Sequence, residues 1–168
     1  SSGSTSDPKG VVLTHRNVLA NARGVTEAIG CNDHDVSMSW MPLTHDMGLI
    51  GCFIVMFANR MQVNLMPTDL FIRRPLLWTT FLSREKATIT CSPNFGYRHY
   101  LKVLGDRQVE GVDLSAVRLI VNGAEPISVE LCDEFMNRLA PAGLSRSAMF
   151  PVYGLAEAAV AMTFPALG

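Results

Sequence analysis

The chain has 168 residues, of which 48% are apolar and 17% charged, with a formal net charge of −1. A chain of this length and composition can bury one substantial core, so we expect a single domain. The balanced charge and scattered arginines argue against a nucleic-acid-binding surface, and the longest apolar run, residues 48–58, has only about half of the ~20 residues that span a membrane.

The opening segment, residues 1–10 (Ser-Ser-Gly-Ser-Thr-Ser-Asp-Pro-Lys-Gly), is rich in groups that bind phosphate. Glycines allow the turns that aim backbone N–H groups at one point, and hydroxyls and a lysine add further donors and positive charge. The spacing differs from the usual P-loop, which has Ser or Thr directly after the lysine. A floppy tail or an expression remnant is the competing interpretation. Because no strand precedes this segment, we expect the chain to be an excerpt of a longer protein.

The remaining chain alternates between strand and helix patterns. A short apolar strand is expected at residues 11–13, and Thr14 then caps a helix that Gly30 closes. Further strands are expected at residues 36–41, 61–66, 87–91, 117–121 and 149–152. Further helices are expected at about residues 46–59, 73–83 and 95–104, and from a cap at Ser128 to Pro141 and Gly143. This alternation predicts right-handed crossovers and a parallel sheet covered on both faces, a three-layer α/β/α fold.

The sulfur-containing residues predict a core and not a metal site. The four cysteines are Cys31, Cys52, Cys91 and Cys132. They lie far apart without a Cys-x-x-Cys pair, so we expect neither structural zinc nor a disulfide framework, but small core residues of a reducing compartment such as the cytoplasm. The methionines should also lie in the core, although Met47 and Met56 could line an adaptable apolar tunnel.

Ligands of parallel α/β sheets bind beyond the carboxyl ends of the strands. Four segments follow predicted strands and should face one rim: residues 42–48, 92–97, 122–126 and 153–157. His45 beside Asp46 could be a general base or metal ligand, or a neutral histidine beside a helix cap. Glu157 could hold magnesium (Mg²⁺) against phosphates, or be an acid favoured at a helix start.

Two further rim positions suit a flat ring. Tyr153 could stack on a base or be half-buried packing, and Gly123 with Ala124 could admit a flat ligand or serve only the turn. No Ser-centred elbow and no Cys–His pairing predicts nucleophilic catalysis. The remaining expected ligands are phosphate, magnesium, a flat ring and an apolar chain.

Five segments together resemble the adenylate-forming superfamily of acyl-CoA synthetases, peptide-synthetase adenylation domains and luciferases. In chain order they are residues 2–10, residues 42–51 (Pro-Leu-Thr-His-Asp-Met-Gly-Leu-Ile-Gly), residues 92–95 (Ser-Pro-Asn-Phe), residues 122–126 (Asn-Gly-Ala-Glu-Pro) and residues 153–158 (Tyr-Gly-Leu-Ala-Glu-Ala). The middle three are most similar to fatty acyl-AMP ligases. The resemblance runs the length of the chain. It implies a fragment of an AMP-binding domain, with a phosphate loop and strand in residues 1–13 and a subdomain with a five-stranded, mainly parallel, flavodoxin-like sheet in residues 14–168.

The resemblance implies that ATP activates a fatty acid to an acyl-adenylate, with release of pyrophosphate, for transfer to the thiol of an acyl carrier protein. It implies His45 and Glu157 as catalytic residues, with His45 near the substrate carboxylate and α-phosphate and Glu157 as a Mg²⁺ ligand. The implied ATP-binding residues are Ser2, Gly3, Ser4, Thr5, Lys9, Gly123, Ala124, Glu125, Tyr153, Gly154 and Ala156. The implied acyl-binding residues are His45, Met47, Gly48, Asn94 and Phe95, in a channel bordered by the helix after His45 and by residues 94–97.

The chain departs from the common family pattern at two places. Ser6 and Asp7 stand where Thr-Gly is common, and Ala156 stands where Thr is common, although alanine is familiar in fatty acyl-AMP ligases. The family's ribose-binding aspartate, hinge and catalytic lysine would lie beyond Gly168, so we expect this chain alone to be inactive or nearly so. Alternatives are an acyl-CoA synthetase that uses coenzyme A, a non-catalytic nucleotide- or acyl-binding module, and a flavodoxin-like signalling or interaction domain.

Overall fold

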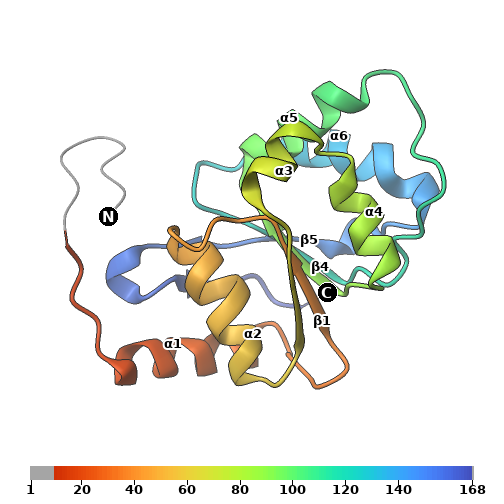
Figure 1. The fold of residues 1–168 in the computed structure, drawn as a ribbon. Coiled ribbons are helices and arrows are strands. Elements are labelled where there is room, and N and C mark those ends of the chain that lie inside the picture. The colour runs from red at the N-terminus through yellow and green to blue at the C-terminus, as the bar shows by residue number, and fades with distance from the viewer. Residues whose placement is uncertain (1–9, 168) are drawn as a thin grey trace.

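The structure is a computed structural model and describes residues 10–167 (Figure 1). Its main sheet contains β1 (Val36–Ser39), β2 (Gln62–Leu65), β3 (Ile89–Ser92), β4 (Leu119–Asn122) and β5 (Met149–Pro151). Its longer helices are α1 (His15–Ala28), the π-helix η1 (Met47–Ile54) continued by α2 (Val55–Ala58), α3 (Thr68–Arg73), α4 (Leu77–Arg84), α5 (Asn94–Leu104) and α6 (Val129–Leu139). Three short 3₁₀ turns and a hairpin complete it: η2 (Ala140–Ala142), η3 (Arg146–Ala148), η4 (Ala156–Ala158), β6 (Tyr153–Gly154) and β7 (Ala161–Thr163).

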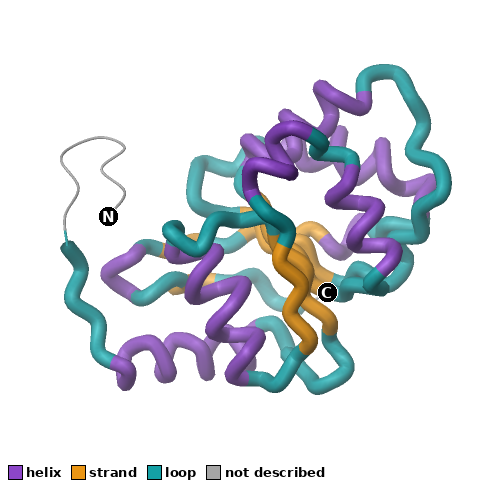
Figure 2. Tube along the Cα trace, viewed as in Figure 1, coloured by secondary structure: helices purple, strands orange, loops and turns teal. Residues whose placement is uncertain are grey.

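The strand order is β2-β1-β3-β4-β5, and every neighbouring pair is parallel. Figure 1 shows α1 and α2 on one face of the sheet and α3 to α6 on the other, and Figure 2 shows the strands enclosed between these helical layers. The predicted five-stranded, three-layer α/β/α fold is therefore confirmed, with the strand order of flavodoxin-like sheets. No helix among residues 10–167 is long and apolar enough to cross a membrane.

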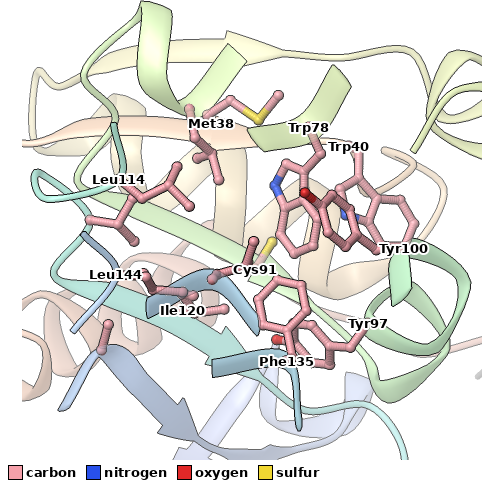
Figure 3. Close-up of a cluster of buried hydrophobic side chains, with 14 of the residues drawn as sticks. Met38, Trp40, Trp78, Cys91, Tyr97, Tyr100, Leu114, Ile120, Phe135 and Leu144 are labelled. Carbon is pink, nitrogen blue, oxygen red and sulfur yellow. The ribbon is translucent and has the colours of Figure 1, made fainter. Parts of the chain in front are cut away.

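The larger core lies between the sheet and helices α3 to α6 and is built on stacked aromatic rings (Figure 3). Trp78 is fully buried, and its indole N–H donates to the hydroxyl of Thr90 on β3 at 3.0 Å. The ring of Phe135 on α6 lies 5.7 Å from that of Trp78 and 4.8 Å from that of Tyr97. Such contacts, in addition to the buried area, hold α4, α5 and α6 against one face of the sheet.

The smaller core lies on the opposite face, where Ala22 and Val25 of α1 and Ile29 directly after it pack with residues of α2 and the sheet. The helix begins as predicted: Thr14 and Asn17 form a reciprocal capping box, with Asn17 N–H donating to the Thr14 hydroxyl at 3.2 Å. The helix ends before Gly30, which has a left-handed φ of 57°. The predicted cap of α6 is also confirmed, because Ser128 accepts a hydrogen bond from the Leu131 N–H.

The structure differs from the predicted elements at three places. In the described part of the chain, residues 11–13 form no strand, because an apolar run without a neighbouring strand has no partner for its backbone. The helix expected at residues 73–83 begins only at Leu77, as α4, and α3, which was not predicted, ends at Arg73; Pro75 forces Arg74 between them out of the helical region. The small-residue segment after Tyr153 contains the β6–β7 hairpin, which the sequence did not predict.

The expectation of unpaired cysteines was wrong for one pair. Cys52 of η1 and Cys91 of β3 form a disulfide, whereas Cys31 and Cys132 are free. Burial, reinforced by the charge of Asp35, raises the pKa of Cys31 to about 11, so this thiol stays protonated at neutral pH.

A buried ion pair ties the amino ends of three strands together. Asp35 precedes β1 and accepts two hydrogen bonds from the Arg118 guanidinium, from Nε at 2.7 Å and from Nη2 at 2.6 Å. It also accepts from the hydroxyl of Thr88, which precedes β3, at 2.7 Å. Arg118, before β4, donates further to the carbonyls of Ile29 and Gly30 after α1. These contacts close the end of the sheet opposite to the candidate site.

Candidate active site

A cavity of about 530 Å³ opens beyond the carboxyl ends of the strands and extends between the sheet, η1 and α1. Its mouth carries polar groups from three loops: His45 and Asp46 after β1, the backbone of Gly123 and Ala124 after β4, and Glu157 on η4. Its interior is apolar and includes Val25, Ile29, Ile50, Met56, Ile89 and Val121. The cavity therefore combines polar groups at its mouth with a long apolar interior.

His45 and Asp46 form a paired acid and base at the start of η1. The Nδ1 atom of His45 lies 2.8 Å from Oδ1 of Asp46, and Asp46 also accepts from the Met47 N–H at 2.7 Å. This hydrogen bond with Asp46 raises the pKa of His45 despite partial burial, and the same bond lowers the pKa of Asp46. In the described part of the chain, the other ring nitrogen of His45, Nε2, makes no hydrogen bond. The pair can therefore hold a proton or positive charge at the mouth of the cavity.

The helix after His45 requires a glycine at one position. Gly48 is buried, and a Cβ there would collide with the carbonyl of Pro42. It permits close approach of the backbone and does not line the cavity. The wall is instead formed by neighbouring residues of η1, among them Met47, Ile50 and Cys52. The π-helical winding of this segment is of a kind often found at functional sites.

The loop after β4 presents backbone to the cavity. Gly123 is buried against Val152, whose side chain would lie 2.9 Å from an added Cβ. Ala124 has φ of 73°, a left-handed conformation that a residue other than glycine adopts at a cost. Glu125 points elsewhere, because its carboxylate accepts the Phe95 N–H of α5 at 2.7 Å. The loop thus offers main-chain groups, and not a charged side chain, to a ligand.

The hairpin after β5 closes the third side of the cavity. Gly154 pairs with Ala161, and a Cβ on Gly154 would collide with the carbonyl of Val160. The turn between the strands carries Ala156 and Glu157 to the cavity, while Tyr153 is largely exposed beside it. The hairpin is held to α1 by Asn21, whose side chain donates to the carbonyl of Ala161 at 2.6 Å. This contact joins the hairpin that carries Glu157 to α1.

The cavity unites many of the residues that the sequence singled out. Those that line it are His45, Met47, Gly123, Ala124, Gly154, Ala156 and Glu157. Those that do not are Gly48, Asn94, Phe95, Glu125 and Tyr153. The predicted phosphate-binding residues Ser2, Gly3, Ser4, Thr5 and Lys9 lie outside the described residues.

The predicted border of the acyl channel by residues 94–97 differs from what the structure shows. Residues 94–97 belong to α5, on the face of the sheet opposite to η1, and Tyr97 is fully buried in the larger core. Sequence reasoning missed the inner wall, which includes Val25, Ile29 and Ser37. The alternation of β1 carries a signal for Ser37: Met38 packs into the larger core, so its neighbour faces the other way.

The acidic groups at the mouth suit magnesium better than a structural metal. Asp46 is engaged by His45, which leaves Glu157 as the carboxylate available there. Among residues 10–167 no group of three or more His, Cys, Asp or Glu side chains is placed to hold a metal. Magnesium is usually held by one or two carboxylates with substrate phosphates and water, so this donor set fits it.

Comparison with known proteins identifies the family of the chain. The whole chain, residues 1–168, matches the family of AMP-binding enzymes. It is 38% identical to a medium-chain-fatty-acid–[acyl-carrier-protein] ligase of Moorena producens over 94% of this chain and 26% of that protein. It is 41% identical to a 4-hydroxyphenylalkanoate adenylyltransferase of Mycobacterium tuberculosis over 95% of this chain and 26% of that protein.

Among solved structures, the chain is similar to a fatty acyl-adenylate ligase of Legionella pneumophila in complex with acyl adenylate and pyrophosphate. The TM-score is 0.94 and the identity 38%, over 98% of this chain and 29% of that one. The chain thus spans about a quarter to a third of the length of these relatives. With a family match along its whole length and the matching fold, the chain belongs to the AMP-binding enzymes, a family of adenylate-forming ligases.

Proposed function

We propose that the protein carrying this chain activates a fatty acid with ATP and passes the acyl group to the thiol of an acyl carrier protein. A carboxylate oxygen of the fatty acid attacks the α-phosphorus of ATP. The bond from that phosphorus to the oxygen bridging it to the β-phosphate breaks, and pyrophosphate leaves with its electron pair. The thiol then loses its proton to solvent and its sulfur attacks the acyl carbon; the bond from that carbon to the phosphate oxygen breaks, and AMP leaves with the electron pair.

The observation that carries this proposal is the cavity, which places a polar mouth over an apolar interior. A fatty acid has the same two parts, and burial of its chain contributes about 0.8 kcal/mol per CH₂ group. The carboxylate would then lie at the mouth beside His45, Gly123 and Glu157.

The residues at the mouth suit the charges of such a reaction. Negative charge grows on the phosphate oxygens and the leaving group during attack, so fixed donors and cations lower the barrier without a protein nucleophile. We assign His45, whose pKa is raised by Asp46, to the substrate carboxylate and α-phosphate. We assign the Gly123–Ala124 backbone and Tyr153 to adenine, and Glu157 to Mg²⁺, which would neutralise phosphate charge when bound.

The phosphate-binding role of residues 2–9 and the cellular compartment of the protein are proposals that rest on the sequence. We assign Ser2, Gly3, Ser4, Thr5 and Lys9 to the β- and γ-phosphates of ATP. We assign Gly154 and Ala156, on the hairpin, to ATP binding as well. We propose the cytoplasm as the compartment, since Cys31 and Cys132 are free thiols, although the Cys52–Cys91 disulfide is unusual for that compartment. We also propose that this chain alone is inactive or nearly so, because the relatives that it resembles are three to four times longer.

The test is exchange of radiolabelled pyrophosphate into ATP by the full-length protein, with a panel of fatty acids. We expect exchange that depends on the fatty acid and that falls by about 10²-fold or more in Glu157→Ala, as when one transition-state contact is lost. Lys9→Ala should weaken exchange, and Glu110→Ala, in an exposed loop, should not. Absence of exchange with any carboxylate would instead favour a non-catalytic nucleotide- or acyl-binding module.

The thiol acceptor needs a second measurement, because the family also contains acyl-CoA synthetases. Mass spectrometry should detect the acyl thioester on an acyl carrier protein bearing its phosphopantetheine arm, and little thioester on free coenzyme A. The reverse outcome would assign the protein to the acyl-CoA synthetases while leaving the adenylation step in place.

A further inference from the structure

Two loops at the carboxyl edge of the sheet are joined by three hydrogen bonds. The Phe95 N–H donates to Oε1 of Glu125 at 2.7 Å, and the side-chain amide of Asn94 donates to the Pro126 carbonyl at 2.5 Å. The side-chain amide of Asn122 donates to Oδ1 of Asn94 at 3.3 Å. We refer to these contacts as the β3–β4 tether, because they link the start of α5, after β3, to the loop after β4.

The position of Glu125 explains why its side chain turns away from the cavity. Residue 93, at the cap position of α5, is a proline and makes no side-chain cap. The first N–H groups of a helix need acceptors, and a carboxylate there also gains from the helix dipole. Glu125 supplies that acceptor from the neighbouring loop. The side chain of Glu125 is thus engaged by α5 and not directed into the cavity.

The tether holds a backbone conformation that is unfavourable on its own. Ala124 lies between Gly123, which lines the cavity, and Glu125, which is anchored to α5. Its left-handed backbone costs about 1 kcal/mol or more and persists only where the surroundings impose it. On one side the buried Gly123 packs against Val152, and on the other the tether fixes Glu125 and Pro126. The loop is therefore fixed from both ends.

We propose that Glu125, supported by Asn94, is a positioning residue of the nucleotide site. It holds the Gly123–Ala124 main chain against the mouth of the cavity before nucleotide arrives, without touching the nucleotide itself. A loop that is already ordered loses less conformational freedom on binding, so the tether increases affinity for ATP. The inference rests on the proposed function, because it assumes that this main chain faces adenine.

The proposal predicts a particular separation of kinetic effects. Glu125→Ala in the full-length protein should raise KM for ATP and Kd for AMP about tenfold, the effect of about 1.4 kcal/mol from one lost charged hydrogen bond. The value of kcat at saturating ATP and the KM for fatty acid should stay within about twofold, because the reacting groups are unchanged. Glu125→Gln keeps an oxygen acceptor for the Phe95 N–H and should restore most of the affinity.

Controls separate positioning from general loss of structure. Glu134→Ala removes an exposed carboxylate on α6 and should change nothing. Hydrogen exchange of the Phe95 amide should be faster in Glu125→Ala, while amides of β3 and β4 keep their protection. Asn94→Ala, which removes the second contact, should raise Kd for AMP in the same direction, and less than additively with Glu125→Ala because both act on one loop.

The outcomes are distinguishable from those that test the reaction. An active wild type with an unchanged Kd for AMP in Glu125→Ala would overturn the positioning role and leave the proposed function intact. A Gln variant as impaired as the Ala variant would also overturn it, because the tether requires only an oxygen that accepts from the Phe95 N–H. A wild type that neither binds AMP nor exchanges pyrophosphate would overturn the proposed function and this inference together.

Discussion

Replacement of Asp35 by alanine is expected to destabilise the fold strongly, because the Asp35 carboxylate is buried and accepts several hydrogen bonds. Asp35 is 3% exposed, and its carboxylate accepts hydrogen bonds from Arg118, Thr88 and Asn32. The Arg118 side chain is 32% exposed and keeps its two carbonyl acceptors after the change. The substitution therefore leaves several hydrogen-bond donors without an acceptor, and water can reach only some of them.

The magnitude follows from that partial access. Loss of one partner from a fully buried ion pair costs about 3–5 kcal/mol. Solvent at Arg118 offsets part of this, so we expect about 3 kcal/mol for Asp35→Ala. For a chain of this length that corresponds to a fall in Tm of about 6–12 °C. Asp33 is the matched control, because it is two residues away, its side chain is 81% exposed, and it faces only the exposed His34. Asp33→Ala should change stability by less than about 0.5 kcal/mol.

The assay is urea denaturation of both variants at neutral and acid pH, followed by circular dichroism. Burial alone would raise the pKa of Asp35, but hydrogen bonds from Arg118, Thr88 and Asn32 lower it below its ordinary value. A lowered folded-state pKa means that the contribution to stability is complete above the unfolded pKa of about 3.9 and is lost as the pH falls through the folded value. The difference between wild type and Asp35→Ala should therefore shrink in acid. Equal losses for the two aspartates at neutral pH, or a difference that grows in acid, would refute the reasoning.

Three further predictions concern the core and the cavity. Trp78→Ala should cost about 3–5 kcal/mol in urea denaturation, as for other large core residues, and a cost below 1 kcal/mol would contradict its central position. Asp46→Asn should lower the pKa of His45 in an NMR titration, since the carboxylate raises it now; an unchanged titration would exclude that pairing. Ser37→Ala should keep or increase stability, because the Ser37 hydroxyl makes no hydrogen bond to the described residues; a loss above 1 kcal/mol would reveal a missed partner.

The sequence predicted correctly those features that depend on residues close together in the chain, such as helix caps. Thr14 and Ser128 were predicted as caps because a hydroxyl there satisfies the first free N–H groups of a helix, and both do so. Strand positions were confirmed to within a few residues, because short apolar and β-branched runs suit a parallel sheet whose central strands are buried on both faces. The same logic failed for residues 11–13, where the apolar pattern is present but no neighbouring strand completes it among the described residues.

Tertiary contacts were beyond the reach of these signals. The tether role of Glu125 depends on a helix start in a different loop, 30 residues away in sequence. The Cys52–Cys91 disulfide joins η1 to β3 at the cavity wall, and the spacing of the cysteines in the sequence does not predict it. Side-chain direction in loops is set by whichever unsatisfied group lies nearby, and the sequence does not say which group that is.

The strand order decides which helices lie on the same face of the sheet as the cavity, and the sequence pattern does not predict that order. Crossovers between parallel strands are right-handed, so the direction of each step across the sheet decides which face its helix covers. The step from β1 to β2 runs one way, and the steps from β2 to β3, β3 to β4 and β4 to β5 run the other way. Hence η1 and α2 cover one face and α3 to α6 the other, as Figure 1 shows. An alternating sequence pattern predicts the layers without predicting strand order. With the order β2-β1-β3-β4-β5, the same handedness rule places Phe95 and α5 on the face of the sheet opposite to η1.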